Sequence, residues 1–200
     1  MTMSNPPRLY LAGPEVFLPN AHAIGAAKSA ICADHGLAGV FPLDGDLDLD
    51  GLSPAQQARR ISLANEGLMR SCDAILANMT PFRGAAMDSG TAFEVGFMRA
   101  LGQPVFGYSN VASDYAARAR AMRSIGLPAG DFDADGVEIE DFGLAENLMI
   151  AVAVSETGSD VVRHASAGDD VRCDLAGFTR AVRAAADHFK EHPPRGGHIP

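Results

Sequence analysis

The chain has 200 residues, of which 47% are hydrophobic, and this size is enough for one substantial core and favours a single domain. Its 16 basic and 25 acidic residues give a net charge of -9, which argues against binding to a nucleic acid polymer or to an anionic membrane surface. The three cysteines form no CxxC pair, so the sequence indicates neither a disulfide framework nor a zinc site. Without a signal peptide or an apolar run long enough to span a bilayer, we expect a cytoplasmic protein.

Apolar runs bounded by Gly and Pro alternate along the chain with longer stretches of helical periodicity. This alternation is typical of βαβ units around a parallel sheet. Strands are predicted at residues 8–12, 39–41, 74–79 and 104–108. Helices are predicted at residues 20–35, 54–71, 89–101 and 115–124. Ser53 and Pro54 are a favourable N-cap and first helical residue for the second of these helices.

The C-terminal part of the chain has a weaker pattern. Residues 125–143 are rich in Gly and Asp and are expected to form a loop. Residues 144–154 fit a helix or a buried strand, of which we predict the helix, and residues 175–189 fit an amphipathic helix. The predicted fold class is therefore α/β, a single-domain parallel-sheet sandwich of the flavodoxin-like or Rossmann-like kind with an extra C-terminal helix.

Ligands of open α/β sheets bind at the carboxyl ends of the strands, so the segments that follow the strands are where a site is expected. The first strand leads into Gly13 and Pro14. Gly13 lets the backbone approach a ligand, and Phe17 can stack on a flat base. The alternative is an ordinary strand-to-helix turn, in which Gly and Pro are common. The third strand leads into a long loop at residues 80–88, and long loops on such scaffolds are often functional.

The strongest local signal is the segment DSGTAFEVG at residues 88–96. Ser89 or Thr91 can cap the helix that begins here, which places Glu94 about one turn inside its amino end. The helix dipole favours an ionised carboxylate at that place, and an ionised carboxylate can act as a nucleophile. The small residue at Gly90 leaves room for a ligand. The alternative is a capping-box acid with no chemistry.

Three carboxyl groups, those of Asp73, Asp88 and Glu94, are predicted to share one neighbourhood at the edge of the sheet. Phe93 and Phe97 are four residues apart and are expected to face the core, which directs Glu94 away from it. Cleaving a glycosidic bond with retention needs a carboxylate that attacks the anomeric carbon and an acid that protonates the leaving group. The three groups can supply these roles, and the chemistry needs no metal and no organic cofactor.

These segments also carry a resemblance. The residues concerned are YLAGP at 10–14 with Phe17, Asp73, DSGTAFEVG at 88–96 and NLM at 147–149. In order and spacing over residues 8–155, they resemble the nucleoside 2-deoxyribosyltransferase family. The resemblance implies a domain of that kind at residues 1–160, and residues 161–200 are expected to form a C-terminal helical extension and a flexible tail.

The resemblance implies a role for each of these residues. Glu94 is the nucleophile that forms a covalent deoxyribosyl enzyme, Asp73 and Asp88 contact base and sugar and assist proton transfer, and Tyr10 positions the nucleophile. Substrate contacts are expected for Gly13, Pro14, Phe17, Asp44, Gly90, Asn147 and Met149.

Two of these contacts, from Asn147 and Met149, are implied to complete the site of a neighbouring subunit, so a homo-oligomer is expected. The binding partners implied are small-molecule deoxynucleosides and free nucleobases.

Two other functions stay open on the sequence. A nucleoside or deoxynucleotide N-glycosidase has the same nucleophile but passes the sugar to water, and a nucleotide hydrolase also needs groups for the 5′-phosphate, for which Arg83 and Gly84 are the nearby candidates. A catalytically silent nucleotide-binding module on the same scaffold is the second alternative, because a fold does not fix a function.

Overall fold

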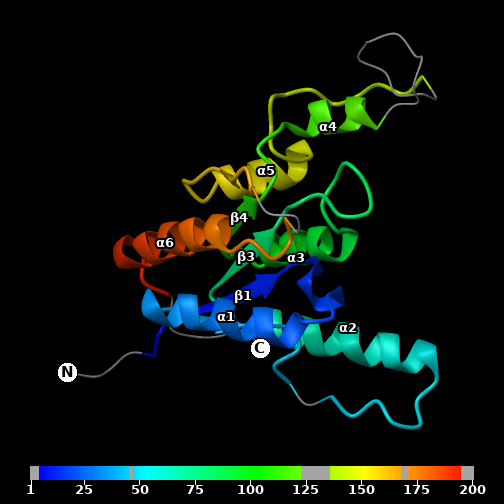
Figure 1. Cartoon of the computed structure of the whole chain (residues 1–200). Helices are drawn as coiled ribbons and strands as arrows, with labels where there is room; N and C mark the ends of the chain where they lie inside the picture. Colours follow the sequence, from blue (N-terminus) through cyan, green and yellow to red (C-terminus); the bar gives the residue numbers. More distant parts are fainter. Residues whose placement is uncertain (1–4, 46, 123–135, 168–170, 195–200) are drawn as a thin grey trace.

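A computed structural model describes residues 5–45, 47–122, 136–167 and 171–194 of the chain (Figure 1). One parallel sheet has the strand order β2-β1-β3-β4-β5. The strands are β1 (Arg8–Ala12), β2 (Ala38–Val40), β3 (Ala74–Asn78), β4 (Val105–Ser109) and β5 (Val162–Arg163). This order is that of flavodoxin-like doubly wound sheets, and it confirms the predicted fold class.

Helices connect the strands in the predicted order. They are the short 3-10 helix η1 (Pro14–Phe17) and the α-helices α1 (Ala21–Asp34), α2 (Pro54–Arg70), α3 (Ser89–Ala100), α4 (Tyr115–Ala121), α5 (Leu148–Ser155) and α6 (Ala176–Glu191). Ser53 caps α2 in a capping box with Gln56, which explains why that helix begins where the sequence predicts. Helix α5 begins later than predicted because the side chain of Asn147 accepts a hydrogen bond from the backbone N–H of Met149 and caps it there.

Two of the predictions for the C-terminal half reach beyond the described residues. Of the loop expected at residues 125–143, residues 125–135 lie outside the described part of the chain. The helix expected at residues 115–124 is present as α4, and the last two of its predicted residues also lie outside the described part.

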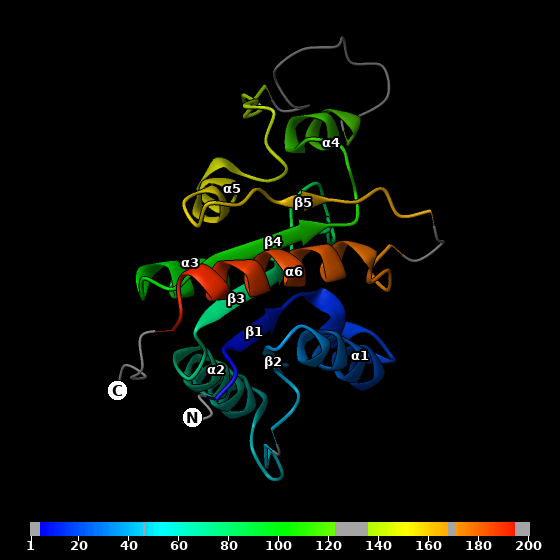
Figure 2. The ribbon, with the colours of Figure 1, turned by 90° about the vertical axis from the view of Figure 1, so that its left-hand side faces the viewer.

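The sheet separates two layers of helices. One face packs against α1 and α6, of which α6 lies in front of the strands in Figure 2, and its core includes Leu9, Leu11, Phe106, Tyr108, Phe178 and Val182. The other face packs against α2, α3 and α5, and its core includes Tyr10, Ile75, Met69, Val95, Met98 and Val154. Strands β1, β3 and β4 are buried almost throughout, as expected for strands that are covered on both faces.

The C-terminal segment supplies a strand and a helix to this sandwich. The two residues of β5 pair with Tyr108 and Ser109 of β4, and so short a strand was not predicted. The extra C-terminal helix is present as α6, with Phe178, Val182 and Phe189 buried at helical spacing. Its inner face thus completes one core layer, whereas the division at residue 160 stays a prediction. In the described part of the chain, no helix is long and apolar enough to cross a membrane.

Candidate active site

A cavity of about 760 Å³ lies beside the carboxyl ends of β1 and β2 and the amino end of α3. Its walls come from the turn after β1, the loop after β2, one side of α2 and the first turns of α3. Most of the side chains that line it are apolar. The polar ones are His22, Asn65, Asp88, Thr91 and Glu94. An apolar cavity with a few converging polar groups is typical of a small-molecule site.

Glu94 on α3 presents its carboxylate to this cavity. The hydroxyl of Tyr10 on β1, 84 residues away in the sequence, donates a hydrogen bond to Oε1 of Glu94 at 2.7 Å. Because Tyr10 is fully buried in the sheet, its hydroxyl has a fixed position. The hydrogen bond therefore fixes one oxygen of the carboxylate against the wall of the cavity.

The surroundings of Glu94 make its proton labile near neutral pH. Burial raises the pKa of Glu94 to about 7, the hydrogen bond from Tyr10 lowers that pKa, and the charge of Asp88 raises it. The net effect is opposite to the ionised carboxylate predicted near the amino end of the helix, because burial has the largest influence on this pKa. Burial also raises the pKa of Tyr10, as does the neighbouring Glu94, so the phenol stays a hydrogen-bond donor.

Asp88 forms both the cap of α3 and part of the cavity wall. Its carboxylate accepts hydrogen bonds from the backbone N–H of Thr91 at 2.9 Å and from the Thr91 hydroxyl at 3.1 Å. The prediction that Ser89 or Thr91 caps the helix is therefore wrong, since the helix begins one residue after Asp88. The cap fixes the Asp88 carboxylate close to the helix that carries Glu94.

The predicted core face of α3 also needs a correction. Phe93 is 59% exposed, whereas Phe97, whose ring lies 6.1 Å from that of Phe93, is partly buried and packs against the core as predicted. The residues that face the sheet are Thr91, Val95 and Met98, which are spaced as one helical face and are buried. Phe93 was a misleading signal because the size of its side chain suggested a core position.

Beneath the cavity wall, a buried ion pair supports the turn at Gly13. The fully buried carboxylate of Glu15 accepts hydrogen bonds on Oε1 from Lys28, from Asn78 Nδ2 at 2.9 Å and from the Tyr108 hydroxyl at 2.9 Å. Oε2 of Glu15 would lie 2.0 Å from a Cβ atom at Gly13. Position 13 therefore accepts no side chain unless the buried carboxylate moves. This cluster was not predicted from the sequence.

Among the residues that the structure describes, no group of three or more His, Cys, Asp or Glu side chains could hold a metal ion.

A family model described as nucleoside 2-deoxyribosyltransferase matches residues 9–149, a range that holds Tyr10, Asp88 and Glu94. The chain belongs to the nucleoside 2-deoxyribosyltransferase family. The predicted family membership is thereby confirmed.

Several relatives of this deoxyribosyltransferase family member are informative. An uncharacterized protein of Schizosaccharomyces pombe, C191.05c, is 32% identical over 169 residues, which cover 78% of this chain and 80% of the yeast protein. A 2-deoxyribosyltransferase from Leishmania mexicana is 28% identical with a TM-score of 0.61, and the match covers 94% of this chain and 99% of that one. A conserved protein of Enterococcus faecalis shares the fold at 15% identity, with a TM-score of 0.50 over 90% of this chain and 98% of that one.

Most of the site residues predicted for this family member lie together. The cavity is lined by Gly13, Phe17, Asp88, Gly90 and Glu94. Pro14 begins η1 beside them, and Tyr10 contacts Glu94 from beneath. Asp44 is flanked by the cavity residues Leu43 and Gly45, while its own carboxylate accepts a hydrogen bond from the backbone N–H of Phe41 at 2.8 Å.

Asp73 lies elsewhere. It precedes β3, at the amino ends of the strands, and its carboxylate accepts a hydrogen bond from the backbone N–H of Arg8 at 2.7 Å. The cavity is at the carboxyl ends, so Asp73 does not join Asp88 and Glu94 there. The role of Asp73 in proton transfer stays a prediction, and Asp73 does not line the cavity.

Asn147 and Met149 lie at the amino end of α5 and do not line the cavity of their own chain. The Asn147 side chain donates to Glu140 at 2.9 Å, and Met149 is 71% exposed.

Sequence reasoning missed the contribution of α2. Ile61, Ala64, Asn65 and Leu68 line the cavity at helical spacing. The apolar members of this stripe were visible in the sequence as one face of the helix. Asn65 is the polar residue on that face, and His22 faces the same cavity from α1.

Proposed function

We propose that this protein transfers a 2-deoxyribosyl group between nucleobases by a retaining double displacement, with Glu94 as the nucleophile. The observation that carries the proposal is the Glu94 carboxylate, which lines an apolar cavity and is fixed by the Tyr10 hydroxyl at 2.7 Å. The family supports it, as does the likeness over 94% of the chain to a 2-deoxyribosyltransferase of Leishmania mexicana. The proposal includes a role in nucleotide salvage in the cytoplasm.

In the first step, the ionised carboxylate of Glu94 forms a bond to C1′ of the sugar while the bond from C1′ to the base nitrogen breaks. The leaving base takes up one proton from solvent, a transfer that Asp88 at the cavity assists. In the second step, a nitrogen of another base attacks C1′, the ester bond to Glu94 breaks, and the base loses a proton. Two inversions at C1′ give overall retention.

The other predicted contacts complete this proposal. Phe17 and Gly13 lie where a flat base can pack, Gly90 leaves space at the start of α3, and Pro14 and Asp44 border the same region.

We further propose that the protein is a homo-oligomer in which Asn147 and Met149 complete a neighbouring site. The support for this is that Met149, 71% exposed, and Val152 lie on α5 while the exposed Phe93 lies on α3, a helix that contacts α5. Exposed apolar side chains that form one patch mark an interaction surface. Sedimentation of the purified protein measures the subunit count.

The deciding experiment is incubation with deoxyinosine and free adenine. A transferase yields deoxyadenosine and hypoxanthine, a hydrolase yields hypoxanthine and deoxyribose, and a silent binding module yields neither. Incubation with a 2-fluoro-2-deoxynucleoside, followed by peptide mapping, should place the trapped sugar on the peptide that contains Glu94. A label on any other carboxylate overturns the assignment.

One observation favours a nucleotide N-glycosidase as the second candidate. A smaller hollow of about 550 Å³ contains Arg83 and shares Phe17 with the main cavity. The guanidinium of Arg83 lies 5.4 Å from the ring centroid of Phe17 and 4.7 Å from that of Phe82, and its backbone has a φ of 56°. The Arg83 guanidinium could there bind a phosphate group of the substrate. Release of base from a deoxynucleoside 5′-monophosphate, without an acceptor base, distinguishes this activity.

A further inference from the structure

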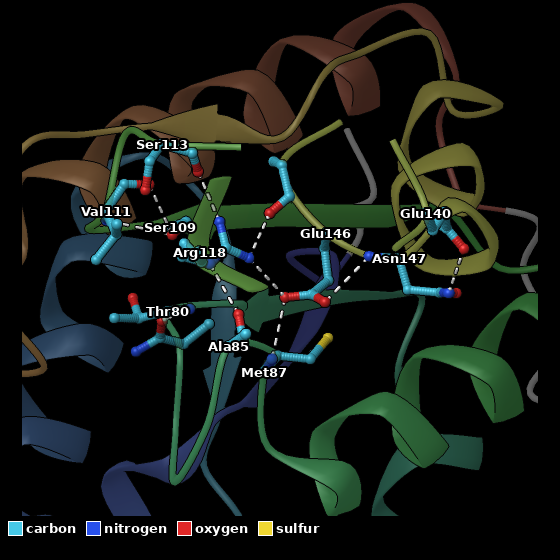
Figure 3. Close-up of polar contacts among 12 residues, drawn as sticks. Thr80, Ala85, Met87, Ser109, Val111, Ser113, Arg118, Glu140, Glu146 and Asn147 are labelled. Atoms are coloured by element: carbon cyan, nitrogen blue, oxygen red, sulfur yellow. Dashed lines mark hydrogen bonds and ion pairs between the residues drawn. The ribbon is translucent and has the colours of Figure 1, made fainter. Parts of the chain in front are cut away.

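A buried arginine links three segments of the chain, which are the loop that precedes α3, the residues before α4 and the residues before α5. Arg118 of α4 is 8% exposed. Its guanidinium donates hydrogen bonds to the carbonyl oxygens of Ala85 at 2.8 Å, Ser113 at 2.6 Å and Ala145 at 2.8 Å (Figure 3). A planar fork with several donors suits this arrangement, and a lysine ammonium does not reproduce it.

The carboxylate of Glu146 lies against this guanidinium and is 1% exposed. Its Oε2 accepts hydrogen bonds from the backbone N–H of Met87 at 3.0 Å and from Arg118 at 3.2 Å. Its Oε1 accepts one from the backbone N–H of Asn147 at 3.0 Å. Figure 3 shows Glu146 between the Met87 and Asn147 segments. The Glu146 carboxylate thus accepts hydrogen bonds from three donors.

These contacts act on the segment that ends at the catalytic cavity. Residues 80–88 contain no regular helix or strand, and beside the backbone hydrogen bond from Phe82 to Ala86, side chains of other segments bind their backbone. Arg118 binds the carbonyl of Ala85 and Glu146 binds the N–H of Met87, and the next residue is Asp88. Asp88 then caps α3 and lines the cavity with Glu94.

We propose that Glu146, held by Arg118, is a positioning residue that fixes Asp88 and the first turn of α3 relative to the bound sugar. The inference rests on the proposed function, since Asp88 matters only if the cavity binds a nucleoside. The same carboxylate fixes Asn147, the cap of α5, which the proposed oligomer lends to a second site.

The first test compares Glu146→Gln with Glu156→Gln. Both are the same change at opposite ends of α5, but Glu156 is 57% exposed and contacts only the surface Arg99 in the described part of the chain, at 3.5 Å. Glu146→Gln should lower kcat for base exchange roughly tenfold to a hundredfold with a smaller change in KM, because a displaced group near the reacting atoms costs rate. Glu156→Gln should stay within about twofold of the unaltered protein.

The pH profile separates positioning from a loss of stability. The charge of Asp88 raises the pKa of Glu94, so a displaced Asp88 should move the rise of kcat/KM with pH to lower pH in Glu146→Gln. A protein that is merely destabilised should show a lower kcat/KM at every pH, with the rise of kcat/KM at the same pH as in the unaltered protein. An unchanged kcat and an unchanged profile in a folded Glu146→Gln protein would overturn the proposal.

A second variant keeps the test decisive if Glu146→Gln does not fold. Arg118→Lys retains the charge beside Glu146 but loses the fork, so it should show the same kcat loss to a lesser degree. Hydrogen exchange then gives a readout without activity: the Met87 amide should lose protection in both variants and keep it in Glu156→Gln. If the unaltered protein shows no base exchange, the proposed function fails, whereas unchanged Met87 protection refutes the positioning role alone.

Discussion

Two buried carboxylates lie near the same cavity wall, and the structure surrounds them differently. Glu15 faces the ammonium group of Lys28 and accepts further hydrogen bonds from Asn78 and Tyr108. Glu94 accepts one hydrogen bond, from the neutral hydroxyl of Tyr10, and the charge that acts on it is that of the Asp88 carboxylate. One carboxylate has a cation beside it and the other has an anion.

The difference shows how one fold can use the same side chain for support and for chemistry. A buried charge that is paired and hydrogen-bonded is stabilised as an ion and has no tendency to react. A carboxylate that is buried beside another anion and opened to a cavity is less stable as an ion and gains by forming a bond to an electron-poor carbon. Substitutions at the two sites should therefore affect different quantities.

The largest expected effect is on activity at the second carboxylate. Glu94→Gln keeps the shape of the side chain and removes the attacking charge, so base exchange should fall by about 10⁴-fold or more. Steady-state rates with deoxyinosine and adenine measure the loss, with Glu156→Gln as the matched control. Exchange at the normal rate in Glu94→Gln would show that the nucleophile is a different group.

The next effect is on stability at the first carboxylate. Lys28→Met leaves Glu15 buried without its cation, which should lower the free energy of unfolding by about 3–5 kcal/mol. Urea unfolding measures the change. The double variant Lys28→Met with Glu15→Gln should recover most of it, because no charge is left unpaired, and equal losses in the single and double variants would contradict the account.

A smaller effect on stability is expected at Glu94, with the opposite sign. Its pKa of about 7 in the folded protein lies above the ordinary value of 4.5, so the fold favours the protonated form and loses stability as pH rises from about 4.5 through 7. Glu94→Gln imitates the protonated form. The free energy of unfolding of Glu94→Gln should exceed that of the unaltered protein by about 1–3 kcal/mol at pH 8 and should equal it at pH 4. Urea titrations at the two pH values test the sign.

The smallest effect concerns the hydrogen bond that orients Glu94. The unaltered enzyme should gain kcat/KM as pH rises through about 7, because the nucleophile must be ionised. Tyr10→Phe removes the one interaction that lowers the pKa of Glu94, so its profile should move to higher pH and its rate at pH 6.5 should fall about tenfold. A profile that stays in place would show that the Tyr10 hydroxyl has no effect on the ionisation of Glu94.

Much of the fold was predictable because local signals and burial agree. The buried strands β1, β3 and β4 are short apolar runs between Gly and Pro, and the start of α2 follows from Ser53 and Pro54. The strand β5 was missed because two residues, Val162 and Arg163, carry no periodicity.

The site was predictable only in part, since its contacts join distant segments. The carboxylate of Glu94 could be singled out from its local segment, but the contact with Tyr10 across 84 residues depends on the order of strands. Asp73 shows the limit: the sequence places it beside a strand but does not say that it lies at the amino end, away from the cavity. The pairing of Glu15 with Lys28 has no local signal at all, because it depends on how α1 packs over the sheet.

Helix α6 has a consequence for how the protein is made. The ring of its Phe178 lies 5.8 Å from that of Tyr108 and 5.0 Å from the ammonium group of Lys28, so this helix seals the ion pair beneath Gly13. Every residue assigned to catalysis leaves the ribosome before α6 does. A nascent chain halted ahead of α6 thus holds all the reactive groups but lacks the helix that covers the buried ion pair, and it should become an enzyme only after α6 has been made.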